Sequence, residues 1–432
     1  MENSFISERS NIESGIHAIS GDKRFTCLLV LYLVFGVYKV PQMPAISFGD
    51  VILMVSMIDI VIRRRKIKVF RNHILYGFII YSLIISFLMV FVEHGNLSDT
   101  VTRIVRDAFF YVYMCSFAYS YLDYSTFKKW LKNICIILAL LVIAQELVYI
   151  LTGYLIPGFL LNATVSQTTS ASQIYRHTLA SAGRNGYLKA NGFMTEGAHC
   201  AQALAIALVA SYNFEENDKQ SVKLAIFFTI SSIFTFSASA LFFSGLLWMA
   251  ILISMIRRKQ LSTRIGLPII VLLVALTVFS FVGFESNLSS VVGRIISASS
   301  SETADNSSFF RLYKGFVFWE GLPFLNKLFG IGFGNYGSLY TLYQGTYTQM
   351  LLSEYMNSLS YILVSGGIVG FIIMFAFFAN LFKQSNYKGK TTIILLLFMS
   401  ISSSPYISIY WVLMMLLIIF NLNVYSHETE MR

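Results

Sequence analysis

Charged residues are scarce in this 432-residue chain: Asp, Glu, Lys and Arg make up only 12% of it, about half of their usual share in a soluble domain. Hydrophobic residues make up 56%, and the mean hydropathy is +0.65. The apolar residues form long runs, which indicates an integral membrane protein that crosses the bilayer several times. The net charge of +10 lies in short clusters between these runs, so it does not indicate nucleic-acid binding.

Cysteine is also scarce, and the sequence contains no internal repeat. The chain has four cysteines, and all of them fall inside apolar segments without metal-ligand spacing: Cys27, Cys115, Cys135 and Cys200. We expect buried thiols rather than disulfides. The first 20 residues are polar and mixed in charge, unlike a cleavable signal peptide. The absence of an internal repeat argues against an inverted-repeat transporter.

The apolar runs predict an all-α polytopic integral membrane protein with about twelve transmembrane helices. The predicted spans are 25–40, 46–62, 73–92, 104–122, 130–152, 193–211, 223–238, 240–256, 265–284, 358–382, 390–404 and 406–424. Two runs are too long for one span, and we divide them near 237–239 and near 402–405. With the N-terminus inside, every strongly basic short loop becomes cytoplasmic, as the positive-inside bias requires. Both termini are then cytoplasmic.

Two extracytoplasmic loops stand out by their length. The predicted organisation is a cytoplasmic tail 1–24, helices in 25–152, a basic extracytoplasmic loop 153–192, helices in 193–284, a large extracytoplasmic loop 285–357, helices in 358–424 and a cytoplasmic tail 425–432. Long loops commonly carry function. In the large loop, an aromatic and amphipathic stretch from Phe309 to Phe329 predicts a helix on the membrane surface.

The basic loop contains no acidic residue and leads directly into the sixth span. Arg176, Arg184 and Lys189 lie in it, and guanidinium groups match phosphate oxygens with paired hydrogen bonds. We predict a diphosphate clamp; contact with lipid headgroups is the alternative. Glu196 opens the span as a candidate base, or as a carboxylate that the helix dipole stabilises. His199 follows on the same helix face, and without a second Glu-x-x-His pair no metal site is expected.

The large loop supplies further candidates. Arg311 and Lys314 lie one turn apart and would hold a second phosphate or the acceptor, unless they only snorkel from an interfacial helix. Glu354 and Asn357 enter the tenth span and are expected to face the same cavity as Glu196. The sequence G-I-G-F-G-N-Y-G at 330–337 lacks the strand and helix of a dinucleotide site. We therefore expect a glycine-rich turn that lets the backbone approach a ligand.

Ionisable residues also occur within or beside the predicted spans. Glu146 lies near the outer end of the fifth span, and an acid inside a membrane is a functional candidate. Two pairs spaced by four residues, Asp59 with Arg63 and Arg103 with Asp107, are interpreted as structural ion pairs on a helix surface.

Four stretches together resemble the O-antigen polymerase and ligase superfamily. They are R-N-G-Y-L-K-A-N-G-F-M-T-E-G at 184–197, F-T-F-S-A-S-A at 234–240, an arginine followed by G-I-G-F-G at 311–334, and M-N-S-L-S-Y-I-L-V-S-G-G-I-V-G at 356–370. They resemble, in order, the family's arginine and Gly-Phe and Glu-Pro pattern, its Thr-x-Ser-Arg segment, its large-loop motif and its His-Asn motif. The twelve-span layout is similar as well.

This resemblance implies a glycosyltransferase of a bacterial inner membrane, with its active face extracytoplasmic and no cofactor. The implied substrate is an undecaprenyl-diphosphate-linked glycan, and the implied partners are membrane lipids, a chain-length regulator and a flippase. Gly197, Ala238 and Met356 depart from the family pattern, and at Met356 the ligases carry a histidine. This difference favours a polymerase, with Arg184 and Arg311 as the clamp and Glu196 or Glu354 as the base. A ligase and a flippase or exporter of the same lipid-linked sugar are the alternatives.

Overall fold

The computed structural model describes residues 21–41, 43–63, 66–92, 95–158, 171–185, 188–214, 218–237, 240, 243–245, 247–249, 252–253, 314–335, 356–402, 406 and 408–430. Several predictions fall on other parts of the chain: the ninth span at 265–284, Arg311, Glu354, Ala238, and most of the tail 1–24 and of the large loop 285–357. The predicted eighth span, 240–256, is described only in pieces.

The described part of the chain is mostly helical. Its helices are α2 (Lys23–Phe35), α3 (Phe48–Ile62), α4 (His73–Val92), α5 (Leu97–Val112), the π-helix η1 (Tyr113–Ala118), α6 (Tyr119–Tyr121), α7 (Tyr124–Thr152), α8 (Ala171–Asn185), α9 (Gly197–Phe214), α10 (Asp218–Ile233), α15 (Lys314–Gly321), α16 (Phe324–Phe329), α18 (Ser358–Gln384), α19 (Tyr387–Ser402) and α20 (Ile409–Glu430). Among them α4, α7 and α18 are long and apolar enough to cross a membrane. Shorter apolar helices occur within α9, α10 and α20. The chain is thus a helical membrane protein, and the number twelve stays a prediction.

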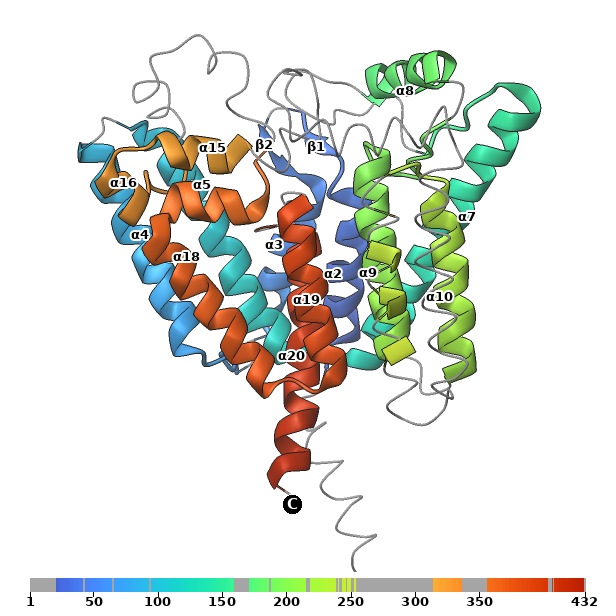
Figure 1. Cartoon of the computed structure of the whole chain (residues 1–432). Helices are drawn as coiled ribbons and strands as arrows, with labels where there is room; N and C mark the ends of the chain where they lie inside the picture. Colours follow the sequence, from blue (N-terminus) through green and yellow to red (C-terminus); the bar gives the residue numbers. More distant parts are fainter. Residues whose placement is uncertain are drawn as a thin grey trace, which may run out of the picture.

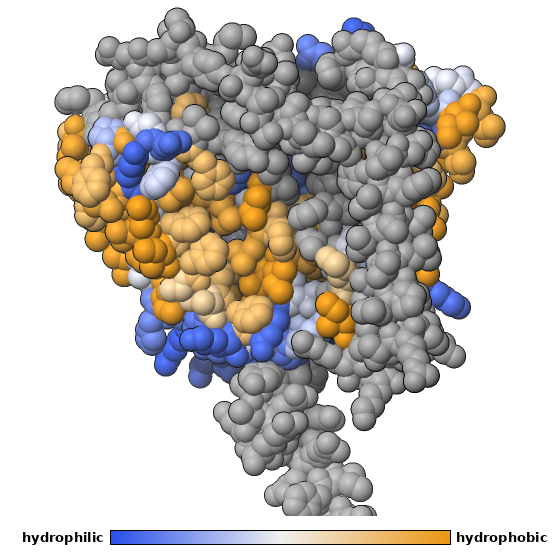
Figure 2. Space-filling view, viewed as in Figure 1, coloured by the Kyte–Doolittle hydropathy of each residue, from blue (hydrophilic) through white to orange (hydrophobic). Residues whose placement is uncertain are grey.

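The long helices form a bundle with two distinct ends (Figure 1). We call the end that carries α8, α15, α16 and the strands β1 and β2 the upper end, and the end at which α20 finishes the lower end. On the face shown in Figure 2 a hydrophobic band separates hydrophilic residues at the lower edge from others near the top. Large apolar side chains are exposed along α3, α4 and α7, among them Ile58, Phe91 and Leu151. This pattern suits a surface covered by lipid.

The first predicted span, 25–40, is too long at its end. Helix α2 stops at Phe35, and a short antiparallel hairpin of β1 (Lys39–Val40) and β2 (Met43–Ser47) follows. Pro41 and Pro44 explain the difference, since proline has no backbone N–H to donate in a helix. After the hairpin, Ser47 and Asp50 form a capping box that begins α3.

The loops contain helices that the sequence analysis placed differently. The basic loop 153–192 holds the helix α8. The single surface helix predicted from Phe309 to Phe329 is wrong: α15 ends at Gly321, and α16 begins at Phe324 after Pro323. Proline disfavours a helical conformation of the residue before it, which separates the two helices.

Helix breaks within the two longest apolar runs lie near the predicted divisions. Helix α10 ends at Ile233, and Phe236 has a left-handed backbone with φ of 44°. Helices α19 and α20 are separate, with Tyr406 between them. The predicted span 104–122 corresponds to α5, η1 and α6 in succession. The π-helix inserts an extra residue per turn, so the side chains above and below it point in directions that a regular helix would not give.

Candidate functional site

The first two family-like segments lie against each other beside α7. The backbone N–H of Ala190 donates to the carbonyl of Phe234 over 3.3 Å. The side chain of Gln145, fully buried in α7, holds the same segment. Its Oε1 accepts from the N–H groups of Asn191 (3.2 Å) and Gly192 (2.9 Å), and its Nε2 donates to the Gly192 carbonyl (3.2 Å). One buried amide therefore fixes the irregular chain that leads to Glu196.

The third and fourth segments form a second pair. Ile331 N–H donates to the carbonyl of Val364 (3.1 Å), and Gly332 N–H donates to that of Ser365 (2.9 Å). These carbonyls are open because α18 is kinked at Gly367, whose φ of 63° and ψ of −171° are not helical. Gly330 also has a positive φ. A Cβ on Gly330 would overlap backbone atoms of α18, and a Cβ on Gly367 would overlap backbone atoms of the turn. The glycines thus allow the backbone of the turn to contact α18. The approach of this backbone to a ligand stays a prediction.

The two pairs meet through the chain around the start of α20. The backbone N–H of Tyr406 donates to Oγ of Ser358, the first residue of α18, over 2.8 Å. The hydroxyl of Tyr410 donates to the sulfur of Met194 over 3.6 Å. All four segments therefore join in one region at the upper end of the bundle.

Glu196 and His199 mark the start of α9 within this region. The Glu196 side chain is exposed, and its main-chain carbonyl accepts the N–H of Cys200 over 3.0 Å. His199 is exposed as well, with Nδ1 2.8 Å from Oγ1 of Thr195. Glu196 is accessible to a substrate, as a base must be. Within the ranges that the structure describes, no cluster of three His, Cys, Asp or Glu side chains is placed to hold a metal.

The remaining predicted residues are spread more widely. Arg176 is exposed on α8, and Lys189 is half-buried beside the Ala190 contact. Arg184 and Lys314 lie in α8 and at the start of α15, with their side chains outside the described part. Asn357 is only 1% exposed, and its side chain accepts the N–H of Ser360 over 2.9 Å as the cap of α18. Asn357 therefore has a structural role at this helix start.

The structure adds a charged residue that the sequence analysis interpreted as structural. Nε of Arg103, on α5, lies 2.9 Å from Oδ1 of Asp107. The guanidinium carbon lies 4.9 Å from the ring centroid of Tyr361 and 5.8 Å from that of Tyr406. The Tyr406 hydroxyl is in turn 3.2 Å from the hydroxyl of Tyr111. We call these five residues the Arg103 cage. Asp107 lies inside a predicted span, and that position of an acid was the signal that could have identified the cage.

The turn of the third segment closes one side of the cage. The ring of Phe333 lies 5.7 Å from the ring of Tyr361, and the Phe333 N–H donates to Oγ of Ser86 on α4 over 2.8 Å. The Thr100 hydroxyl of α5 donates to Oδ1 of Asn335. Since Arg103 follows Leu97 by six residues, it lies about 9 Å along α5 from the upper end.

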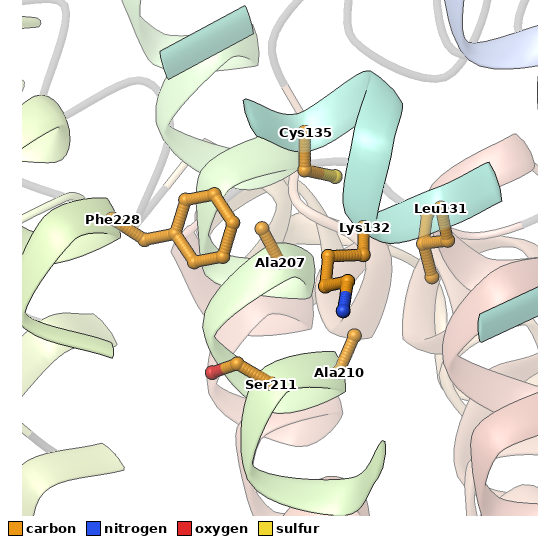
Figure 3. A pocket seen from close by; sticks show the side chains of 7 residues that line it. All are labelled: Leu131, Lys132, Cys135, Ala207, Ala210, Ser211 and Phe228. Carbon is orange, nitrogen blue, oxygen red and sulfur yellow. The ribbon is translucent and has the colours of Figure 1, made fainter. Parts of the chain in front are cut away.

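Glu146 and the small hollow in Figure 3 are two further features of the helix bundle. Glu146 is 4% exposed, and its Oε2 has no hydrogen-bond partner in the described part. The hollow lies between α7, α9 and α10, and Figure 3 shows Lys132 beside Ala210 and Ser211. Its lining is otherwise mostly apolar. Ser211 is close to the lower end of α9, so this hollow is separate from the four segments.

No protein family matches the sequence, and no curated protein matches it. A functional assignment therefore depends on the four segments and on the side chains around them.

Proposed function

We propose that this protein is a polysaccharide polymerase of the O-antigen or capsule type in the inner membrane of a bacterium. It would transfer a growing glycan from its undecaprenyl diphosphate to a new lipid-linked repeat unit. The observation that carries the proposal is the junction of the four family-like segments, which are far apart in the chain and joined by the Tyr406–Ser358 and Tyr410–Met194 contacts. Chance likenesses in sequence would have no reason to meet in space.

The proposed orientation places the junction outside the cytoplasm. Basic side chains follow α3, begin α7 and lie around the α18–α19 turn, all towards the lower end: Lys66, Lys68, Arg71, Lys128, Lys129, Lys383, Lys388 and Lys390. Basic short loops mark the cytoplasmic side. The upper end is then extracytoplasmic, and both termini are cytoplasmic, as the sequence analysis expects.

The proposed reaction needs a base and a stabilised leaving group. The bond between the sugar C1 and the diphosphate oxygen breaks, and C1 bonds to a hydroxyl oxygen of the acceptor sugar. The hydroxyl proton passes to a carboxylate, for which Glu196 is the accessible candidate. The diphosphate leaves with the bonding electrons, and cations stabilise its charge. Arg184 and Arg311 remain the proposed clamp.

The first test is a gel of surface polysaccharide from a strain that lacks the gene, with lipid-linked intermediates extracted in parallel. We expect loss of the ladder with a single repeat unit still attached at the surface. Complete loss with long lipid-linked polymer would instead indicate a ligase. Single lipid-linked units trapped on the inner face would indicate a flippase and overturn the enzyme assignment.

A second test addresses the clamp. We expect Arg184→Ala to reduce polymer length and yield, and Arg184→Lys to restore them only in part, because lysine keeps the charge but loses the planar fork. Arg24→Ala is the matched control, since Arg24 is an exposed arginine at the start of α2. An unchanged ladder in Arg184→Ala would rule out the clamp.

A further inference from the structure

We propose that the Arg103 cage is an anion-binding site, in which the Arg103 guanidinium takes a phosphate group of a lipid-linked diphosphate. The identity of this ligand rests on the proposed function, whereas the affinity for a diphosphate follows from the cage itself. A polymerase joins two lipid-linked glycans, and each brings its own diphosphate. More than one anion site is therefore expected in such an enzyme.

A comparison with Arg63 shows why Arg103 is more than a structural residue. Both arginines are partly exposed, at 30% and 24%, and both have an acid at a spacing of four residues. Arg63 donates to Asp59 through Nε and Nη2 and to Asp22 through Nη1. Its donors are thus largely used within the protein.

The donors of Arg103 are not used in this way. Nε is close to Asp107, but neither Nε nor Oδ1 is in an aligned hydrogen bond. No acceptor in the described ranges takes a hydrogen bond from its Nη groups. A guanidinium carries five N–H donors, and leaving the buried Nε of Arg103 without an aligned acceptor is unfavourable. An anion with several oxygen acceptors would satisfy these donors.

A second arginine and a lysine lie near the upper part of α5. Arg106 is exposed and follows Arg103 by three residues, about one turn of α5. Burial, together with the nearby Arg106 guanidinium, lowers the pKa of the Lys39 amine on β1. Arg103 and Arg106 thus both lie near Asp107, while Asp99 in the first turn of α5 and Asp50 near Lys39 balance part of the positive charge.

The aromatic walls of the cage fix the position of the guanidinium. Tyr361 and Tyr406 are 4% and 6% exposed, and their ring centroids lie 5.8 Å apart. Rings of this kind hold a guanidinium by cation–π contact, so they fix Arg103 in place and leave its outward N–H groups to a ligand. Asp107 would act as a positioning residue, since it contacts Arg103 rather than the ligand.

The test is diphosphate binding to the purified full-length protein in nanodiscs of phosphatidylcholine. The probes are undecaprenyl diphosphate in the disc, inorganic pyrophosphate in solution, and phosphatidylglycerol in the disc. We expect Arg103→Gln to weaken the binding of undecaprenyl diphosphate by roughly tenfold or more, the usual effect of losing charge-assisted hydrogen bonds. Arg103→Lys should bind with intermediate affinity. A preference for the lipid-linked probe over pyrophosphate identifies a lipid headgroup as the ligand, whereas equal affinity identifies the free anion.

Arg24→Gln and Arg63→Gln are the controls, because each removes one positive charge outside the cage. Both should bind like the unchanged protein. Equal binding by Arg103→Gln, or an equal loss in all three variants, would overturn the site, and so would a preference for phosphatidylglycerol over the diphosphate lipid. If Arg103→Gln does not fold, Arg103→Lys and Tyr406→Leu decide the same point, and unchanged affinity in both refutes it. Binding is measured without turnover, so its outcome is independent of the polysaccharide gel.

Discussion

The contact between the glycine-rich turn and α18 predicts that two adjacent glycines will respond very differently to the same substitution. Gly367 has a positive φ, and a Cβ there would overlap the carbonyl oxygen of Leu328. This combination of φ and ψ is essentially restricted to glycine and costs an L-residue about 1–3 kcal/mol, and overpacking typically adds about 1–3 kcal/mol. We therefore expect Gly367→Ala to destabilise the protein by about 2–6 kcal/mol.

Gly366→Ala is the matched control. The new Cβ would meet its nearest neighbour, the Phe333 ring, at 3.4 Å, and the backbone of Gly366 has no positive φ. The assay is thermal unfolding of both purified variants in the same detergent. Gly367→Ala should unfold roughly 5 °C or more below Gly366→Ala. Equal unfolding temperatures would show that the turn does not dock on α18 in this manner.

Two further predictions concern buried and capping polar groups. Gln145→Leu should loosen the segment around Gly192, since each unpaired buried backbone group costs about 1–3 kcal/mol. Maleimide labelling of the buried Cys200, measured by peptide mass spectrometry, should then increase. Unchanged labelling would contradict this role of Gln145. Asp123 caps α7 through Thr126, and Asp123→Ala should cost about 1 kcal/mol of stability at neutral pH. Burial raises the pKa of this carboxyl, but the hydrogen bonds from Thr126 outweigh it and the pKa is lowered. Because the pKa is lower folded than unfolded, the stabilisation is present above the unfolded value and lost as pH falls through the folded value. The two proteins should therefore converge in acid, as unfolding at several pH values will show.

Continuous apolar runs were sufficient to predict several helices closely. The range 73–92 coincides with α4, and 358–382 differs from α18 by two residues. Both runs are long, and polar or basic residues flank them, so the length and the limits of the helix are encoded locally. The residues that cap α18 and begin α9 were likewise identified as helix starts.

The parts that sequence analysis missed depend on partners that are distant in the chain. Arg103 and Asp107 form a simple pair at a spacing of four residues, and only the fold places Tyr361 and Tyr406 over the guanidinium. The π-helix has no local signature in the sequence either. Pro41 and Pro44 are local signals that a helix ends nearby, so an earlier end of α2 was predictable. The span was nevertheless extended to residue 40 because the residues before Pro41 are mostly apolar.

The turn at 330–335 has a consequence for the order in which the molecule is completed. Its residues bond to Ser86 and Thr100, which emerge early from the ribosome, and to Val364 and Ser365, which emerge much later. Chains generally fold from the N-terminus during synthesis. The early helices can enter the membrane and pack, but the turn has no complete partner until the kinked helix follows it. A chain truncated before α18 would thus insert most of its helices and still lack an assembled upper end.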